Sequence, residues 1–331
     1  MPALPRPSNG PGSRYTARAA TTRSRPASAG RRTDIVALTG RLTVRDLWLI
    51  RMLHEHRVLT ATHIAHLAFT GLRSAQRRLR TLHQLGVVDS FRPLHQTGSA
   101  PEHYTLGPAG AALLAAHAGL DVAVTGWRPT STGRIAYSPS LGHDLGVNDF
   151  LVRLTARTHT APSAGVQVWL SEQSCARRWG DIIRPDAYAH WCEGDRVLPF
   201  FLEYDTGSQT LARVEAKLAG YAAFTTTTGT RPALLLLTRT QSRDLALRRR
   251  LANTAHELNL HIATSSLDFT TDTPWARWWT PLAPGAHRST LTELAGVWPD
   301  LTEATGLEVT DADTVLTLPV PPLPPSPASG P

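Results

Sequence analysis

The fold of the first half of this chain is decided by residues 43–85, TVRDLWLIRMLHEHRVLTATHIAHLAFTGLRSAQRRLRTLHQL. Apolar residues recur in this stretch at the three- and four-residue spacing of amphipathic helices, which predicts helices at 43–56, 60–68 and 74–85. Thr43 and Asp46 have the spacing of an N-terminal capping box, and Ser74 is the expected cap of the third helix. Gly86 marks the end of that helix.

A β-hairpin and a fourth helix are expected directly after these helices. Residues 87–94 and 102–106 are strand-like runs separated by a polar loop, and Pro108 begins an alanine-rich helix. Three helices, a hairpin with a polar tip and a closing helix are the elements of a winged helix-turn-helix. We therefore expect a winged-helix DNA-binding domain at residues 40–120.

The outward face of the third predicted helix carries side chains that suit DNA. Four arginines lie among residues 73–80. The expected DNA-binding residues are Arg73, Gln76, Arg77, Arg80 and Gln84 on the helix, with Arg92 and His95 beside the hairpin loop. Arginine pairs with guanine and glutamine with adenine in the major groove, and residues at the hairpin are placed to hold phosphate. The alternative is that these arginines are only solvated.

Charge is unevenly distributed along the chain. Residues 1–33 contain seven Arg and no acidic residue, and residues 40–120 contain nine Arg against four acidic residues. The positive charge therefore sits on the tail and the first domain, where a polyanion would bind. Residues 1–38 have no apolar period and are expected to be a disordered basic tail, which is also explicable as a solubilising extension. Residues 281–331 are assigned to a Pro-rich C-terminal tail.

Composition argues against a membrane or secreted protein. The sequence has no run of about 18 apolar residues, and its N-terminus lacks the apolar segment of a secretory signal. The two cysteines, Cys175 and Cys192, are too few for a disulfide framework or a cysteine zinc site. We expect a cytoplasmic protein without a membrane partner.

A second domain is expected at residues 139–280, after a turn-rich linker at 121–138. Its patterns predict a helix at 141–157, strands at 166–172, 185–191 and 197–205, a helix at 209–224, a strand at 232–238, a helix at 243–258 and a strand at 261–265. This order builds an α/β sandwich around a mixed sheet, so the whole chain is expected to be α+β.

Acidic residues gather on the predicted strands of the second domain. Glu203 and Asp205 share one strand face, and Asp186 on the neighbouring strand and Glu172 at the end of the first strand can join them. His143, on the preceding helix, is expected either near these carboxylates or at a phosphate. Clustered carboxylates suit Mg²⁺ or Mn²⁺, which polarises a phosphodiester and activates water. The expected metal ligands are Asp186, Glu203 and Glu172.

One lysine, Lys217, stands among 34 basic residues. In an arginine-rich sequence, a single lysine marks a position where a compact charge with an adjustable pKa is useful, although chance is the alternative. Helical spacing places Lys217 at the edge of the packed face of its helix, from which its ammonium group can reach the carboxylates. The expected catalytic set is Asp186, Glu203, Asp205 and Lys217.

The second domain resembles the PD-(D/E)xK nuclease superfamily over residues 139–265. Pro185 and Asp186 match the first half of the motif, and Glu203 matches the acidic position of the second half. Asp205 departs from the pattern because it stands at the motif's lysine position. Some members carry this lysine on the following helix, where Lys217 is expected. The resemblance implies a restriction-endonuclease-like α-β-β-β-α-β core and metal-dependent DNA nicking or cleavage.

Over residues 40–265 the chain resembles the replication-relaxation family of actinobacterial plasmids and mobile elements. The resemblance rests on the N-terminal helices, LGHDLGVNDFLVRL (141–154), RPDAYAHW (184–191) and FFLEYDTGSQTLARVEAKLAGYAAF (200–224). It implies DNA binding in plasmid replication or transfer, with double-stranded DNA and other plasmid replication or transfer proteins as partners.

Two hypotheses stay open on this sequence. The first is a divalent-metal-dependent DNA nicking or cleaving nuclease that its winged helix targets to DNA. The second is a non-catalytic winged-helix regulator with an inactive nuclease-like domain. Lys217 and the Asp186–Glu203 pair favour the first hypothesis, and Asp205 at the motif's lysine position favours the second.

Overall fold

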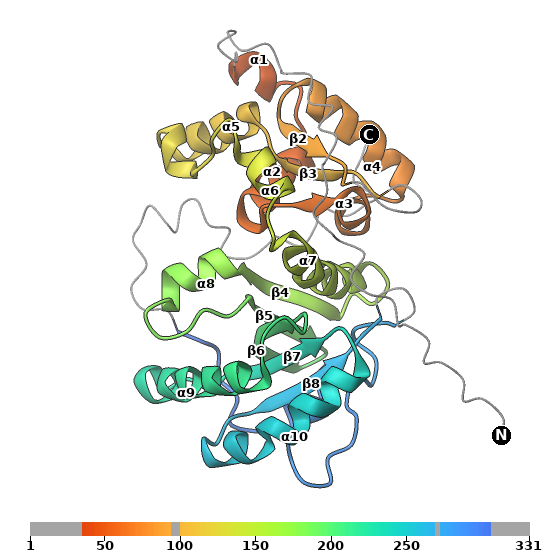
Figure 1. Ribbon diagram of the computed structural model, residues 1–331. Helices are drawn as coiled ribbons and strands as arrows, with labels where there is room; N and C mark the ends of the chain where they lie inside the picture. The colour runs from red at the N-terminus through yellow and green to blue at the C-terminus, as the bar shows by residue number, and fades with distance from the viewer. Residues whose placement is uncertain (1–34, 94–99, 269–271, 306–331) are drawn as a thin grey trace, which may run out of the picture.

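The computed structural model describes residues 35–93, 100–268 and 272–305, which form a mixed α+β structure (Figure 1). Its N-terminal part consists of α1 (Ile35–Thr39), α2 (Val44–His56), β1 (Leu59–Thr60), α3 (Ala61–Ala68), α4 (Leu72–Gln84), β2 (Val88–Phe91), β3 (His103–Leu106) and α5 (Pro108–Ala118). The three strands form an antiparallel sheet in the order β1-β3-β2. The helices α2 to α5 and the strands β2 and β3 follow the predicted order, and α1 and β1 are additions to it.

Local capping chemistry fixes where two of these helices begin. The capping box of α2 is confirmed: the backbone amide of Thr43 donates to Asp46 Oδ2 at 2.7 Å, and Thr43 Oγ1 accepts from the amide of Asp46. Helix α4 differs from the prediction, because it begins at Leu72 and its N-cap is Gly71. Ser74 lies inside the first turn, where its hydroxyl donates to the carbonyl of Gly71 at 2.7 Å.

The second part of the chain is built around a larger sheet. Its elements are α6 (Ser131–Ala136), α7 (Leu141–Ala156), β4 (Ala164–Ser171), α8 (Glu172–Trp179), β5 (Ala187–Glu193), β6 (Arg196–Asp205), α9 (Leu211–Thr228), β7 (Ala233–Thr238), α10 (Gln241–Glu257), β8 (Ile262–Ser266), β9 (Thr280–Pro281) and α11 (Leu291–Val297). Short 3₁₀ turns cover Val122–Thr125 and Arg157–His159. From α7 to β8 the predicted order of elements is found, with the short helix α8 as an addition.

The larger sheet is mixed and has the strand order β4-β5-β6-β7-β8-β9. Strands β4, β5 and β6 pair antiparallel, whereas β6, β7 and β8 pair parallel and β9 returns antiparallel. Side chains alternate across it, so that Phe200 and Leu202 join the core under α7 and α11 while Phe201 joins the core under α8, α9 and α10. The expected mixed sheet between two helical layers is therefore present (Figure 1).

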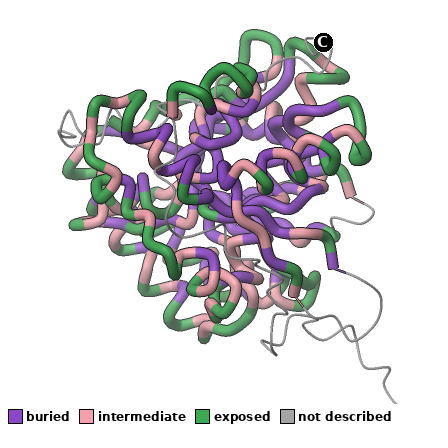
Figure 2. The backbone as a smooth tube through the Cα atoms, turned by 90° about the horizontal axis from the view of Figure 1, so that it is seen from above, coloured by how far each residue is buried: buried purple, intermediate pink, exposed green. Residues whose placement is uncertain are grey.

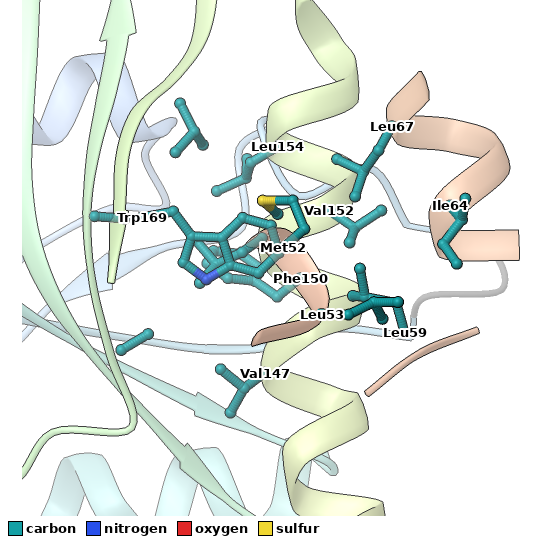
Figure 3. Packing of buried hydrophobic residues seen from close by; sticks show 14 of the residues in the cluster. Met52, Leu53, Leu59, Ile64, Leu67, Val147, Phe150, Val152, Leu154 and Trp169 are labelled. Carbon is teal, nitrogen blue, oxygen red and sulfur yellow. The ribbon is translucent and has the colours of Figure 1, made fainter. Parts of the chain in front are cut away.

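One hydrophobic core runs through both parts of the chain. Figure 3 shows Met52 of α2 beside Phe150 of α7 and Trp169 of β4, and Leu67 of α3 beside Val152 of α7. These residues belong to a single cluster of buried side chains, and α3 packs directly against α7. Figure 2 shows the same continuity as buried backbone through the centre, with exposed segments around it. The segment 121–138, predicted as a linker, therefore connects two parts that share a core.

Part of each predicted tail is folded. Residues 35–39 form α1, and Leu38 is buried in the core; residues 1–34 lie outside the described residues. At the other end, residues 281–305 are folded onto the sheet. Helix α11 starts with a capping box between Thr290 and Glu293, and its Leu291 is fully buried. Burial of such apolar side chains stabilises residues 281–305 in their folded form. Residues 306–331 of the predicted tail lie outside the described residues.

Among the described helices, none combines the length and the apolar composition that crossing a bilayer requires.

Candidate nucleic-acid interface and carboxylate cluster

The outward face of α4 presents the side chains that the sequence assigned to DNA. Ala75, Leu79 and Leu82 are fully buried, which fixes the rotation of the helix. The opposite side therefore exposes Arg73, Gln76, Arg77, Arg80 and Gln84. Within the described part of the chain, none of these three guanidinium groups has a carboxylate partner. Free arginines on one helix face leave their hydrogen-bond donors available to an anion.

Arg78, the fourth arginine of α4, has a structural role. Its Nε donates to Asp46 Oδ1 at 3.0 Å, its Nη2 bonds the other carboxylate oxygen, and the same nitrogen donates to the carbonyl of Arg41 at 2.9 Å. Asp46 is only 1% exposed, so this arginine neutralises a buried charge and ties α4 to α2. Arg78 was not among the expected DNA-binding residues, and the three arginines of α4 that were, Arg73, Arg77 and Arg80, have no such carboxylate partner among the described residues.

Of the two residues expected to bind DNA beside the hairpin loop, Arg92 is described by the structure and His95 is not. Arg92 lies at the end of β2 and donates from Nε to Glu102 Oε2 at 3.0 Å, so its charge is balanced across the hairpin. A balanced arginine attracts phosphate less strongly than a free one. His95 lies outside the described residues, within the loop 94–99.

Asp186, Glu203 and Lys217 meet at the start of β5. The amide of Asp186 donates to the carbonyl of Leu202, which places Asp186 opposite Glu203 on the neighbouring strand. Lys217, on α9, brings its Nζ to 2.5 Å from Glu203 Oε2. Tyr221, one helical turn further, donates from its hydroxyl to Glu203 Oε1 at 2.6 Å. Sequence reasoning named Lys217 and missed the Tyr221 hydroxyl, although the same spacing places both on one helix face.

Burial dominates the electrostatics of this cluster. Glu203 is 8% exposed, and burial together with the neighbouring Asp186 raises its pKa above the ordinary value, against the lowering effect of Lys217. Burial lowers the pKa of Lys217, but Glu203 outweighs this and raises it, so that the ammonium form is retained. Burial and Glu203 also raise the pKa of Tyr221, so its hydroxyl remains a donor.

Asp186 is held from the other side of the sheet by His143. Oδ2 of Asp186 accepts from the amide of Tyr204 at 2.7 Å and lies 2.9 Å from His143 Nε2. Gly146 allows α7 to approach this closely, because a Cβ at that position would lie 2.2 Å from the ring of Tyr204. Burial lowers the pKa of His143, yet hydrogen bonds to Asp144 and Asp186 outweigh it and raise the pKa to about 10. This histidine is therefore cationic at neutral pH.

The remaining two expected carboxylates, Asp205 and Glu172, lie at the end of β6 and at the start of α8. Asp205 lies at the end of β6, where Oδ2 accepts from Arg243 Nε at 2.8 Å and Oδ1 accepts from the amide of Gly207 at 2.7 Å. Glu172 is the first residue of α8 and not the end of a strand, and it is exposed. Burial, then the charges of Asp186 and Asp144, raise the pKa of Glu172, so it lies within electrostatic reach of Asp186.

The residues in this cluster do not fit a bound divalent metal as they stand. Each of the three strand carboxylates already has a cationic partner: Lys217 for Glu203, His143 for Asp186 and Arg243 for Asp205. Over residues 35–93, 100–268 and 272–305, no group of three or more His, Cys, Asp or Glu side chains is arranged to hold a metal ion. A hard cation needs several oxygen ligands that carry uncompensated charge.

Comparison with known proteins identifies the family of this α+β chain. A family model described as replication-relaxation matches residues 50–234, which extend from α2 to the start of β7. The chain belongs to the replication-relaxation family, and this membership suggests a role in the replication or transfer of a plasmid or other mobile element. Neither a search of curated proteins nor a search of solved structures gave a match.

Proposed function

We propose that this chain is a winged-helix DNA-binding protein of plasmid or mobile-element replication or transfer, and that α4 is its recognition helix. The observation that carries the proposal is the row of exposed arginine and glutamine side chains on α4, three of whose arginines have no carboxylate partner among the described residues. Such side chains reach base edges when a helix lies in the major groove.

The surroundings of α4 support this proposal. Helices α3 and α4 pack against each other, and the β2–β3 hairpin follows α4 directly, as the wing follows the recognition helix in winged-helix proteins. The sequence before α1 adds seven arginines and no acid over residues 1–33, which would strengthen non-specific attraction to phosphate.

Binding of the full-length chain to duplex DNA, followed by fluorescence anisotropy across a range of salt concentrations, tests the proposal. We expect affinity to fall steeply with salt, because each arginine–phosphate contact releases a counterion. The double substitution Arg77→Ala and Arg80→Ala should weaken binding by about 1–3 kcal/mol for each base-contacting residue, or lower the salt slope by about 1 for each phosphate-contacting residue.

Arg249→Ala is the matched control for this experiment, because Arg249 is an exposed arginine on α10. It should leave affinity and salt slope as in the wild type. Equal effects of the α4 and α10 substitutions, or binding that does not respond to salt, would contradict the assignment of α4.

We further propose that the second part is a restriction-endonuclease-like fold that does not cleave DNA. The support is that Lys217, His143 and Arg243 occupy the carboxylates that a metal would need. Protein cations in these positions stabilise the buried acids without a metal. On this proposal, the second part serves as a scaffold or a contact surface for DNA or protein.

One observation favours the second candidate function, metal-dependent DNA nicking: Lys217 contacts Glu203, and the charge of Asp186 acts on the same glutamate. Incubating the full chain with supercoiled plasmid and Mn²⁺ or Mg²⁺, followed by gel electrophoresis, separates the two proposals. No nicking is expected. Nicking that disappears in Lys217→Ala, while DNA binding persists, would establish the enzyme and overturn the non-catalytic proposal.

A further inference from the structure

The three arginines of α4 that have no carboxylate partner among the described residues lie in one line along the helix. Arg73, Arg77 and Arg80 are separated by four and three residues. At about 100° of rotation per residue, these spacings place the three side chains within an arc of about 60°. The arc is opposite the buried side of α4, so all three side chains are exposed in the same direction. We call these three side chains the arginine stripe.

No hydrogen bond or ion pair ties the side chains of the arginine stripe to another part of the described chain. Arg78, on the flank of the same helix, shows the contrast, because Asp46 and the carbonyl of Arg41 hold its guanidinium group. The arginine stripe therefore keeps all its N–H donors available to a ligand.

A side chain that only donates hydrogen bonds is matched best by one base in the major groove. Guanine presents two acceptors there, O6 and N7, whereas adenine and cytosine each present an amino donor and thymine presents a single acceptor beside a methyl group. The guanidinium group has five donors in a planar fork and no acceptor, so it pairs with both acceptors of guanine at once. Helix α4 contains no Asp or Glu, the side chains that accept from the amino group of cytosine.

The length of the arginine stripe sets how many base pairs it covers. Seven residues separate Arg73 from Arg80, which corresponds to about 10 Å along the helix axis. Base pairs stack at about 3.4 Å, so this length covers about four base pairs. The stripe begins in the first turn of α4, and the N-terminal residues of a recognition helix are those that contact base edges.

Contact with phosphates is the other role that exposed arginines have on DNA. Phosphates lie along the two walls of the major groove, and the base edges form its floor. Side chains in a single line on the outward face of a helix point at the floor, whereas side chains on the flanks point at the walls. The alignment of the arginine stripe therefore favours base edges.

We propose that the arginine stripe recognises guanines, so that the target of this chain is a duplex sequence with three guanines within about four base pairs. The inference rests on the proposed function of α4 as a recognition helix and adds the sequence that this helix selects. Arg73 and Arg80 face the outer two guanines, and Arg77 faces the guanine between them.

Selection of bound duplexes from a library with a randomised segment, using the full chain, tests the sequence. Guanine should be enriched at three positions within about four base pairs. Salt-sensitive binding without an enriched base, or with a different base enriched, overturns the guanine proposal and leaves α4 as a DNA-binding helix. Absence of any DNA binding overturns both this inference and the proposed function.

Modified bases separate contact with guanine from contact with phosphate. Replacing the selected guanines by 7-deazaguanine removes the N7 acceptor and keeps base pairing and phosphate charge, so affinity should fall about tenfold or more. Inosine at the same positions is the control, because it keeps O6 and N7 and lacks only the amino group that guanine presents in the minor groove. Equal affinity for the guanine and 7-deazaguanine duplexes overturns the proposal.

Glutamine in place of one arginine of the stripe should change the preferred base at one position. Glutamine both donates and accepts, as adenine does, so Arg77→Gln should replace guanine by adenine at the middle position and leave the outer two unchanged. Arg77 is exposed, so this change does not disturb the core. Arg249→Gln, at an exposed position on α10, is the matched control and should change no position. A uniform loss of affinity for all sequences in Arg77→Gln would show that Arg77 holds phosphate, and would overturn its assignment to guanine.

Discussion

Replacement of Arg78 by methionine separates the two roles that arginines have on α4. Arg78 neutralises Asp46, which is 1% exposed, and its own side chain is 28% exposed. Removing one partner of a fully buried ion pair costs about 3–5 kcal/mol. Asp46 keeps its hydrogen bonds from the amide and hydroxyl of Thr43, at 2.7 and 2.8 Å, and Arg78 is partly solvated. We therefore expect a smaller loss, of about 2–3 kcal/mol.

Calorimetric or fluorescence-monitored melting of the full chain measures this loss. A folded region of this size loses about 2–4 °C per kcal/mol, so Arg78→Met should lower the melting temperature by about 5–10 °C. Arg77→Met is the matched control on the same helix, and because Arg77 is exposed it should change stability by less than about 0.5 kcal/mol.

DNA binding should show the opposite pattern. Well below its melting temperature, Arg78→Met should keep the salt slope of the wild type, whereas Arg77→Ala should change affinity or slope. If Arg78→Met is as stable as Arg77→Met, the buried pair with Asp46 does not contribute as argued. If it alone weakens DNA binding, Arg78 contacts DNA and the assignment of roles is wrong.

Lys217→Met should destabilise the fold more at about pH 8 than at about pH 5, because burial and Asp186 raise the pKa of Glu203 above 4.5 and the ionised Glu203 carboxylate then lacks its cation. Tyr221→Phe, which keeps Lys217 beside Glu203, is the control. A loss of stability that does not depend on pH would contradict the argument. His143 has its pKa raised to about 10, so its stabilising contribution is complete below 6.5 and is lost as pH rises through 10. The melting temperature of His143→Gln should accordingly fall furthest below that of the wild type near pH 6, and a deficit that grows with pH would refute the assignment. Deletion of residues 1–34 should leave the melting temperature unchanged and weaken non-specific DNA binding, because it removes seven arginines; a large loss of stability would show that this segment is part of the fold.

Most of the fold could be predicted from short-range patterns in the sequence. The α2 helix could be placed to within one residue, because its apolar spacing and the Thr43–Asp46 capping box are both local. The order of strands and helices from α7 to β8 was equally readable from alternating and helical apolar patterns. Lys217 could be directed at Glu203 because strand and helix periods fix which side chains share a face.

The predictions that were wrong concern segments whose sequence carries two conflicting patterns or one that is too short. Prolines in residues 281–331 suggested a tail, although Thr290, Leu291 and Glu293 together carry the capping box and apolar start of α11. The sequence pattern predicts Glu172 at a strand end, because the eight-residue helix α8 is too short to show a clear period. Its position predicts Ser74 as a helix cap, yet the Ser74 hydroxyl donates to the carbonyl of Gly71 from within the first turn.

Partners far apart in the sequence were beyond sequence reasoning. Arg243 meets Asp205 from 38 residues away, and Arg78 meets Asp46 from 32 residues away. Nothing local distinguishes these arginines from exposed ones, since only the packed structure shows which carboxylate each faces. The same holds for His56, whose burial beside Trp169 depends on β4 lying against α2.

The packing of α3 against α7 holds the N-terminal part and the sheet-bearing part at a fixed separation. A duplex that lies against α4 would meet the sheet-bearing part at one constant offset along its axis. That offset is set by the shared core and not by the length of the segment 121–138. Protection of DNA by the second part should accordingly fall a fixed number of base pairs from the sequence that α4 contacts. Inserting residues into that segment should leave this spacing unchanged.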